Sequence, residues 1–368
     1  MKRKAFGLLV MLLCLGLGFS MTAMAQAKDP AKIWLRDGPH TLLDTDAIKE
    51  QMDIARELAG DDYYFLTTQR LQCNDIDDTY TIVGPPGPNV LPPDFMSTGF
   101  HEAPAVPTQV FDNVYYVGGM EVGGWLIDTG DGYIMLDSSY DYGATEILEP
   151  NMAELGLDPA QIKYILITHA GPDHIGAAGY FQDEYGTKVV SDSTFRNGYP
   201  VATVMDDGDT LTLGNTTITM VLTPRTVGGG GFSYFIPVKI NGRPHMWATY
   251  GNTNVVGSIE DKEVYLESMT KFLGYVDDLK PDIAISSHPF VDGSLDRMAI
   301  IRECNDKRGH HKKWNKRKCR RNPFLIGKEA ARRYFEILEQ CAVVQLYRQE
   351  AGLPDTGLDY EPPRPPRP

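Results

Sequence analysis

The sequence predicts an α+β fold in which two mixed β-sheets pack face to face and helices cover their outer surfaces. Two observations support this prediction. Short apolar runs rich in β-branched and aromatic residues come in two batches, and a helical stretch follows each batch. Glycine-rich and Asp-Gly turns separate many of these runs, as in antiparallel hairpins. Strands in batches between helices are typical of two sheet layers enclosed by helices.

The first batch of predicted strands opens the main domain near Val110. A predicted helix over 143–155, which ends at Gly156, interrupts this batch. A second helix is expected from about Ile175. The predicted strands of the batch are 113–118, 124–129, 133–137, 164–168 and 189–191.

The second batch contains a clear hairpin signal, because two strand-like runs flank Gly214-Asn215. A long helix is predicted over 262–278, and an apolar strand over 281–287 follows it. The other predicted strands of this batch are 210–213, 216–222, 231–240 and 246–250.

The main domain is expected to span 108–350. The regions before and after it differ from it in composition. Within 26–107, Thr45 can cap a helix over 46–59 that ends at Gly60. Ile48, Met52, Ala55 and Leu58 share one face of that helix, which is enough to dock on a larger body. Residues 84–107 are rich in proline and glycine and predict an extended arm, and 351–368 predict a disordered tail.

The first 25 residues have the pattern of a secretory signal peptide. Three basic residues precede the apolar run Phe6–Phe19, and the small-residue site Ala23-Met24-Ala25 predicts cleavage after Ala25. An uncleaved anchor is the alternative. We therefore expect a periplasmic or secreted protein with no transmembrane segment in its mature chain.

Charge and cysteine content narrow the functional classes. The 368-residue chain has a net charge of −14; loss of three basic residues with the signal leaves 32 basic against 49 acidic residues, or −17. Such an acidic protein is not expected to bind nucleic acid. Cys73, Cys304, Cys319 and Cys341 predict one or two disulfides in an oxidising compartment, and all three complete pairings stay open.

The segment 164–178, YILITHAGPDHIGAA, is the strongest functional signal. An apolar strand ends at once in His169, Asp173 and His174, and imidazole and carboxylate groups are zinc ligands. This turn resembles the H-x-H-x-D-H motif of the metallo-β-lactamase superfamily, with Gly171 in place of the middle histidine. The resemblance extends over about 110–341 and implies that family's αββα sandwich.

The resemblance also implies a ligand set, closest to the subclass whose zinc ligands are all His and Asp. Such enzymes bind two zinc ions at two sites. The first site takes the first and second histidines of the turn and the histidine of a later TPGH segment. Here Gly171 replaces the second histidine and TPRT at 223–226 replaces TPGH, so we expect the first site to be lost. The second site keeps Asp173, His174 and the late His288, which would hold one zinc ion. His169 could be an extra ligand, a base or a hydrogen-bonding group.

Three other residues are candidates for substrate binding. Arg225 could replace the charge of the lost metal and bind an anionic group, or it could fill space and pair with Asp173. Asn252 and Asn254 follow a strand near the expected pocket, where they could contact substrate or form a turn.

A basic stretch, Lys307–Arg321, stands out in this acidic chain within an expected insertion over 305–322. It could contact a polyanion or an acidic surface, or it could be a solvated loop.

The expected function is that of an exported zinc-dependent hydrolase. A single zinc-bound hydroxide would attack the carbonyl of a small-molecule lactam, lactone or ester, with His169 and Asp173 as catalytic residues. The alternative is a non-catalytic binding protein that keeps the fold and holds a small anionic ligand.

Overall fold

The computed structural model describes residues 44–73, 101–194, 203–306 and 319–353. The predicted signal peptide, most of the proline-rich arm, most of the basic stretch and nearly all of the predicted tail lie outside the described residues. Among the described helices, none is long and apolar enough to cross a membrane.

The first sheet has seven strands in chain order. It starts as an antiparallel meander and turns parallel from β4 onward, so that β4, β5, β6 and β7 run in one direction. Its strands are β1 (Thr108–Phe111), β2 (Val114–Tyr116), β3 (Trp125–Asp128), β4 (Tyr133–Leu136), β5 (Ile162–Leu166), β6 (Lys188–Ser191) and β7 (Thr203–Val204).

The second sheet has five strands in the order β12-β11-β10-β9-β8, antiparallel except for the parallel pair β11 and β12. The predicted Gly214-Asn215 turn joins β8 to β9, and Gly214 takes the positive φ of 53° that suits glycine. The strands are β8 (Thr210–Leu213), β9 (Thr216–Leu222), β10 (Phe232–Ile240), β11 (Arg243–Thr249) and β12 (Ile283–Ala284).

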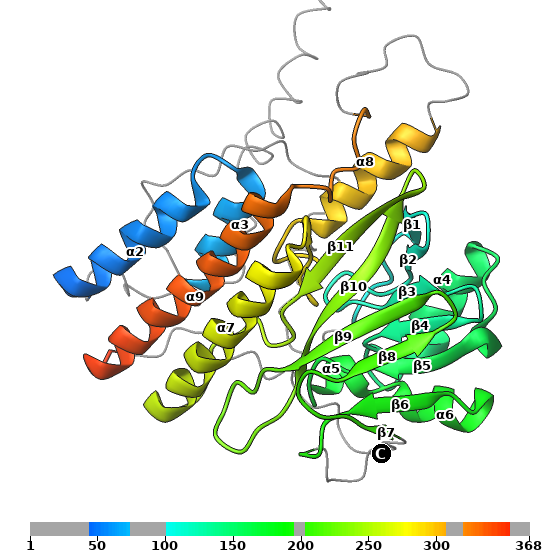
Figure 1. Ribbon diagram of the computed structural model, residues 1–368, viewed down its shortest axis with the longest axis horizontal. Helices are drawn as coiled ribbons and strands as arrows, with labels where there is room; N and C mark the ends of the chain where they lie inside the picture. The colour runs from blue at the N-terminus through cyan, green and yellow to red at the C-terminus, as the bar shows by residue number, and fades with distance from the viewer. Residues whose placement is uncertain (1–43, 74–100, 195–202, 307–318, 354–368) are drawn as a thin grey trace, which may run out of the picture.

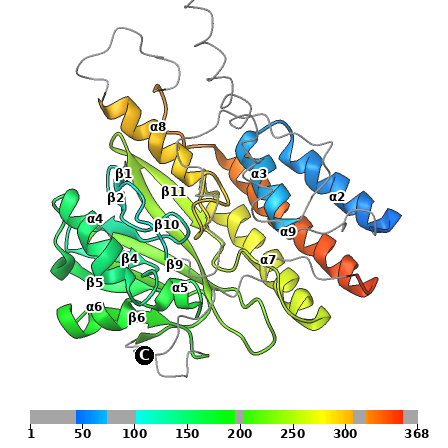
Figure 2. The same ribbon diagram turned by 180° about the vertical axis from the view of Figure 1, so that it is seen from behind.

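Helices cover the outer face of each sheet, which completes the predicted α/β/β/α order of layers (Figures 1 and 2). On the first sheet lie a π-helical turn (Ala144–Leu148) with α4 (Glu149–Glu154), α5 (Pro172–Ile175) and α6 (Ala178–Tyr185). On the second lie α2 (Asp46–Ala59), α3 (Tyr63–Gln72), α7 (Ile259–Leu279) and α9 (Lys328–Glu350). A further helix, α8 (Ser294–Asp306), packs against β1.

Three apolar clusters hold these layers together. The central one lies between the sheets and joins Trp125 of β3 to Trp247 of β11, whose ring centroids are 5.3 Å apart. One outer cluster fills the space between the first sheet and its helices, and the other lies beneath α2, α7 and α9. The fold prediction is therefore confirmed layer by layer.

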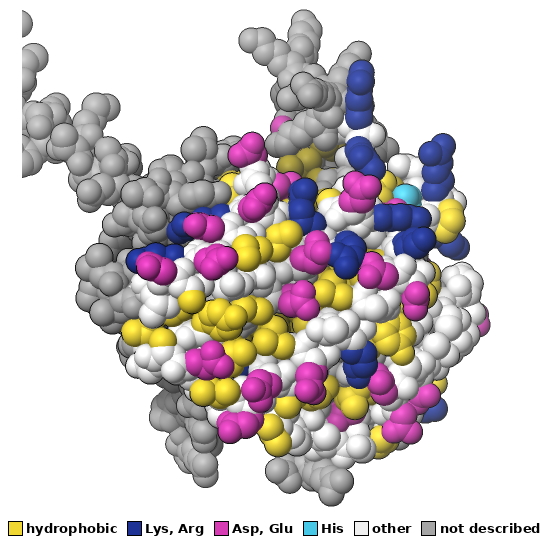
Figure 3. Space-filling view, turned by 60° about the vertical axis from the view of Figure 1, so that its left-hand side comes forward, with side chains coloured by type: hydrophobic (Ala, Val, Ile, Leu, Met, Phe, Trp, Pro, Cys, Tyr) yellow, Lys and Arg dark blue, Asp and Glu magenta, His cyan; other side chains and the backbone are white. Residues whose placement is uncertain are grey.

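The N-terminal helix forms as local signals predict. The Thr45 hydroxyl accepts a hydrogen bond from Ile48 N, and the helix ends at Gly60 with a φ of 59°. Its buried face rests on α9. The outer surface of this helical layer mixes apolar, acidic and basic side chains (Figure 3).

Two disulfides settle the cysteine pairing that the sequence left open. Cys73, after α3, joins Cys341 in α9, and Cys304 in α8 joins Cys319. Disulfides persist in oxidising, extracytoplasmic compartments, and both bonds are consistent with such a location.

Some boundaries differ from the predictions. The strand expected over 281–287 pairs only at Ile283–Ala284, and the helix expected from Ile175 begins at Pro172, so Asp173 and His174 lie inside it. The predicted helix 143–155 starts as a π-helical turn. The sequence reasoning did not identify α3, α8, β1 or β7.

Candidate metal centre

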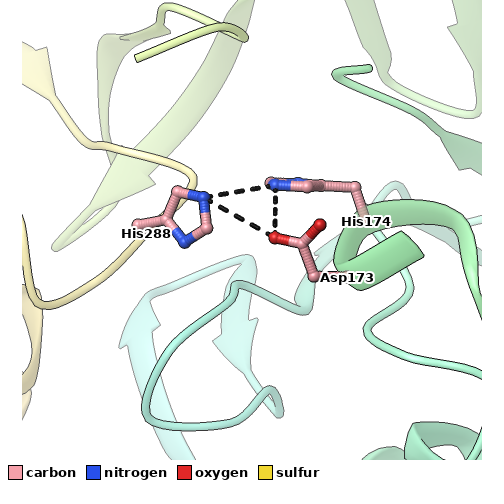
Figure 4. A group of neighbouring side chains, drawn as sticks. All are labelled: Asp173, His174 and His288. Atoms are coloured by element: carbon pink, nitrogen blue, oxygen red, sulfur yellow. Dashed lines mark hydrogen bonds and ion pairs between the residues drawn. The ribbon is translucent and has the colours of Figure 1, made fainter. Parts of the chain in front are cut away.

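The candidate centre lies where the ends of the two sheets meet. The chain leaves β5 at Leu166, passes through His169, and enters α5, which carries Asp173 and His174. His288 comes from the other half of the sandwich, shortly after β12. Figure 4 shows these three side chains pointing toward one another from α5 and from the loop after β12.

Asp173, His174 and His288 form a triangle of ligand atoms. His174 Nε2 is 3.1 Å from Asp173 Oδ2 and 3.3 Å from His288 Nε2, and His288 Nε2 is 3.8 Å from the same carboxylate oxygen. Each of the three residues offers one ligand atom, and these three atoms lie within 4.8 Å of one another. The structure therefore brings together the three metal ligands predicted from sequence.

The far side of each imidazole ring is held by an acceptor. His174 Nδ1 is 2.8 Å from Asp137 Oδ2, and His288 Nδ1 is 3.0 Å from the Glu121 carbonyl oxygen. Because a carbonyl oxygen can only accept, His288 Nδ1 must carry a proton, and the Asp137 carboxylate favours the same tautomer for His174. In the neutral rings both Nε2 lone pairs then face the centre.

Three acceptors that converge in this way require a cation between them. Tetrahedral zinc with ligands at about 2.0 to 2.2 Å places its ligand atoms about 3.3 to 3.6 Å apart. The three observed separations span this range. Two imidazoles and a carboxylate, each ring fixed by an outer acceptor, are a normal ligand set for zinc. The residues present therefore fit a single metal ion.

Without a metal, a proton takes the place of the cation. Burial disfavours the charged form of His174, but the carboxylates of Asp173 and Asp137 outweigh it and raise the pKa of His174 to about 10. Burial and the charged His174 lower the pKa of His288 to about 4. Burial works against ionised Asp173, yet His174 and His288 keep the pKa of that carboxyl well below its ordinary value.

His169 lies beside this centre and is partly exposed. Its ring centroid is 4.1 Å from that of His174. A Cβ placed on Gly171 would lie 2.9 Å from His169 Nε2 and 2.6 Å from Asp173 Oδ1, so both atoms border the space beside Gly171. Burial, His174 and Arg225 lower the pKa of His169 well below its ordinary value.

The predicted substrate-binding residues have different surroundings. Arg225 is partly exposed, and its charge acts on His169 and on Tyr265. Asn252 is fully buried and donates from Nδ2 to the Thr223 carbonyl, which makes it a structural contact beneath the 223–231 segment. Asn254 is partly exposed. Two further histidines, His101 and His245, pair with Glu146 and Asp282.

Sequence reasoning missed the residues that surround the ligands. Asp137 also accepts hydrogen bonds from the Thr168 amide, at 2.8 Å, and from its hydroxyl. A signal for it was present: Asp137 directly follows β4, and the ends of parallel neighbours β4 and β5 share one sheet edge. Glu102 and Glu121 are also buried close by, and burial raises the pKa of Glu102 to about 7. No local pattern indicated either glutamate.

Comparison with known proteins agrees with this geometry. Residues 122–200 match the family model described as the metallo-β-lactamase superfamily. The FEZ-1 metallo-β-lactamase of Legionella gormanii is 20% identical with a TM-score of 0.54, and the match covers 68% of this chain and 99% of FEZ-1.

Two further solved structures give similar values. BJP-1, a subclass B3 metallo-β-lactamase of Bradyrhizobium japonicum, is 23% identical with a TM-score of 0.53 over 68% of this chain and 97% of BJP-1. A Cronobacter sakazakii metallo-β-lactamase with a HARLDQ motif is 23% identical with a TM-score of 0.55, over 68% of this chain and 92% of that one. At these identities the likeness establishes the fold. This chain therefore has the fold of the metallo-β-lactamases, and its residues 122–200 match the model of that superfamily.

Proposed function

We propose that this protein is an extracytoplasmic hydrolase that holds a single zinc ion on Asp173, His174 and His288. Its proposed substrates carry a lactam, lactone or ester carbonyl. One observation carries the proposal: both histidines direct Nε2 at Asp173 Oδ2, because both Nδ1 atoms are engaged with acceptors on the far side of the rings. A bound zinc ion would supply Lewis acidity, lowering the pKa of water and polarising a carbonyl.

The chain's own residues provide the remaining functions. Asp173 and the two histidines bind the ion, while Asp137 and the Glu121 carbonyl orient the rings. His169 is neutral near neutral pH because its pKa is lowered, so its imidazole can accept a proton. Its Nε2 borders the same space as Asp173 Oδ1, which is where a water molecule could lie between base and ligand.

Arg225 suggests the charge of the substrate. Its guanidinium is near enough to His169 to oppose protonation of that ring, and it is partly exposed. A cation at the edge of the site favours a substrate with a carboxylate group. The lactam carbonyl is the first class to test, because the solved relatives are β-lactamases. Cleavage of the signal after Ala25 and a polyanion contact through Lys307–Arg321 remain predictions.

The test begins with protein purified metal-free and titrated with zinc. We expect about one zinc ion per chain, as for a three-ligand site that keeps an open position. His288→Ala should abolish stoichiometric binding. His245→Ala is the matched control, because His245 Nδ1 is held by a different carboxylate, Asp282, at 2.6 Å.

Activity is measured on the same preparations with a chromogenic lactam and simple esters. Turnover should follow zinc content in the native protein and in His245→Ala. No bound zinc at micromolar concentrations would contradict the metal centre. Zinc binding without turnover of any of these substrates would favour the alternative, a binding protein for a small anion.

A further inference from the structure

The loop between β2 and β3 contacts His288 directly. This glycine loop, residues 118–124, contains four glycines around Glu121. The Glu121 carbonyl accepts the His288 Nδ1 proton at 3.0 Å, and Gly123 N donates to the Ser287 carbonyl at 2.8 Å. The position of the loop therefore decides where the His288 ring points and which of its nitrogens carries the proton.

A buried carboxylate from another part of the chain holds this loop. Glu102 is 2% exposed, and its Oε1 accepts hydrogen bonds from the amides of Glu121 at 3.0 Å and Val122 at 2.9 Å. Gly119 makes room for it, because a Cβ there would lie 1.9 Å from Glu102 Oε1. Glycine at 119 and glutamate at 102 are thus matched by shape as well as by hydrogen bonding.

The second oxygen of Glu102 reaches the other half of the centre. Ser139 Oγ donates to Glu102 Oε2 at 3.1 Å. Ser139 belongs to a turn in which Asp137 and Ser139 have φ values of 56° and 62°, a conformation that is uncommon for non-glycine residues. The same turn holds His174, through Asp137 Oδ2 and through the Ser138 amide, which donates to the His174 carbonyl at 2.7 Å.

We propose that Glu102 is a positioning residue that couples the two histidine ligands of the metal centre. One of its carboxylate oxygens fixes the glycine loop behind His288, and the other fixes the turn behind His174. This inference rests on the proposed metal centre for its consequence, but the hydrogen bonds that define the role join groups of the chain itself.

The chemistry of the contact requires a group that accepts three hydrogen bonds. Two amides and one hydroxyl converge on Glu102, and alanine would leave them unpaired in a buried place. Glutamine is different, because its oxygen can still accept both amides while its NH₂ group faces a hydroxyl that can accept. Glu102→Ala should therefore release the loop, and Glu102→Gln should keep it.

The experiment measures zinc affinity by competition with a chelator. Loss of a residue that orients a metal ligand weakens metal binding about 10- to 100-fold, and we expect this for Glu102→Ala but not for Glu102→Gln. Gly119→Ala should act like Glu102→Ala, since its methyl group displaces the carboxylate. Glu149→Gln is the control, because Glu149 accepts hydroxyl bonds from Tyr180 and Tyr185 on α6.

A second readout separates positioning from general stability. In metal-free protein with isotope-labelled histidine, NMR should find His288 protonated at Nδ1 in the native chain and in Glu102→Gln, and mixed tautomers in Glu102→Ala. If Glu102→Ala keeps native zinc affinity and a single Nδ1–H tautomer, the positioning role is wrong. Absence of zinc binding by the native chain would refute the proposed function, while the tautomer result would still decide the role of Glu102.

A third measurement needs no variant, which matters if Glu102→Ala does not fold. The amides of Glu121 and Val122 should exchange with deuterated solvent as slowly as those of buried strands, because they donate to a buried carboxylate. Exchange at the rate of an exposed loop would overturn the proposal.

Discussion

Replacement of Asp137 by asparagine tests whether the tautomer of His174 controls zinc binding at the centre. The change keeps the size of the side chain, and asparagine tolerates the left-handed backbone, so the φ of 56° needs no adjustment. Its oxygen can still accept from the Thr168 amide. Its NH₂ group then faces His174 Nδ1, where the native carboxylate accepts at 2.8 Å.

Two donors cannot face each other, so His174 must change its tautomer and carry its proton on Nε2. That nitrogen is the atom directed at Asp173 and His288. Changes of this kind beside a metal ligand weaken binding about 10- to 100-fold, which corresponds to about 1.4 to 2.7 kcal/mol. We therefore expect Asp137→Asn to fold normally and to lose zinc affinity by that factor.

The assay is a zinc competition titration at neutral pH, with circular dichroism to verify the fold. Asp282→Asn is the matched control, because Asp282 holds His245 Nδ1 in the same way, away from the centre. If Asp137→Asn binds zinc within about twofold of the native protein, the tautomer argument fails.

The remaining predictions concern protons and disulfides. Zinc uptake near neutral pH should release about one proton per ion, seen by calorimetry in buffers of different ionisation enthalpy, because His174 with a pKa of about 10 is charged until metal displaces its proton. The metal-free protein gains stability from charged His174 below pH of about 6.5, and its unfolding temperature should fall as pH rises toward about 10, less so in His174→Gln. The pKa of His288 is lowered to about 4 in the folded protein, so only the unfolded chain gains a proton there as pH falls from about 6.5 toward 4. The folded protein should therefore lose stability over that range. Serine pairs at Cys73 and Cys341 should lower the free energy of unfolding by about 5 to 6 kcal/mol, against about 3 for the pair at Cys304 and Cys319, since the closed loops span 268 and 15 residues. Equal losses in urea titrations of the two variants would contradict the loop-length argument.

Local signals in the sequence predicted the fold well where an element depends on its own residues. Thr45 and Gly60 bound α2 as expected, and the Gly214-Asn215 turn joins β8 to β9. The strand after α7 was predicted too long, because the prediction carried the apolar run that ends at Ile285 on through Ser286 and Ser287. There the backbone amides have side-chain partners: Ser286 N donates to Asp292 Oδ2, and His288 N donates to Ser286 Oγ. No pattern in the sequence predicts that these amides bind side chains and not a neighbouring strand.

The residues of the candidate site also fall into those that a local motif predicted and those that it did not. Asp173, His174 and His288 were identified because a motif contains them, and the fold brings them together. Asp137, Glu102 and Glu121 act through contacts between segments far apart in the chain. His174 and Asp137 are 37 residues apart, and His288 and Glu121 are 167 apart. Only the packed sandwich creates those pairs.

The bond between Cys73 and Cys341 closes a covalent ring that contains both sheets of the sandwich. Every strand of both sheets, and each of Asp173, His174 and His288, lies on the chain between these cysteines. A protease that cuts the backbone once inside the ring therefore produces a nicked molecule whose two pieces stay joined through sulfur. The Cys304–Cys319 bond adds a smaller ring around most of the Lys307–Arg321 stretch, the richest run of trypsin sites in the sequence. In a compartment where proteases are met and disulfides are stable, a single cut there leaves the ligands of the centre in one covalent assembly.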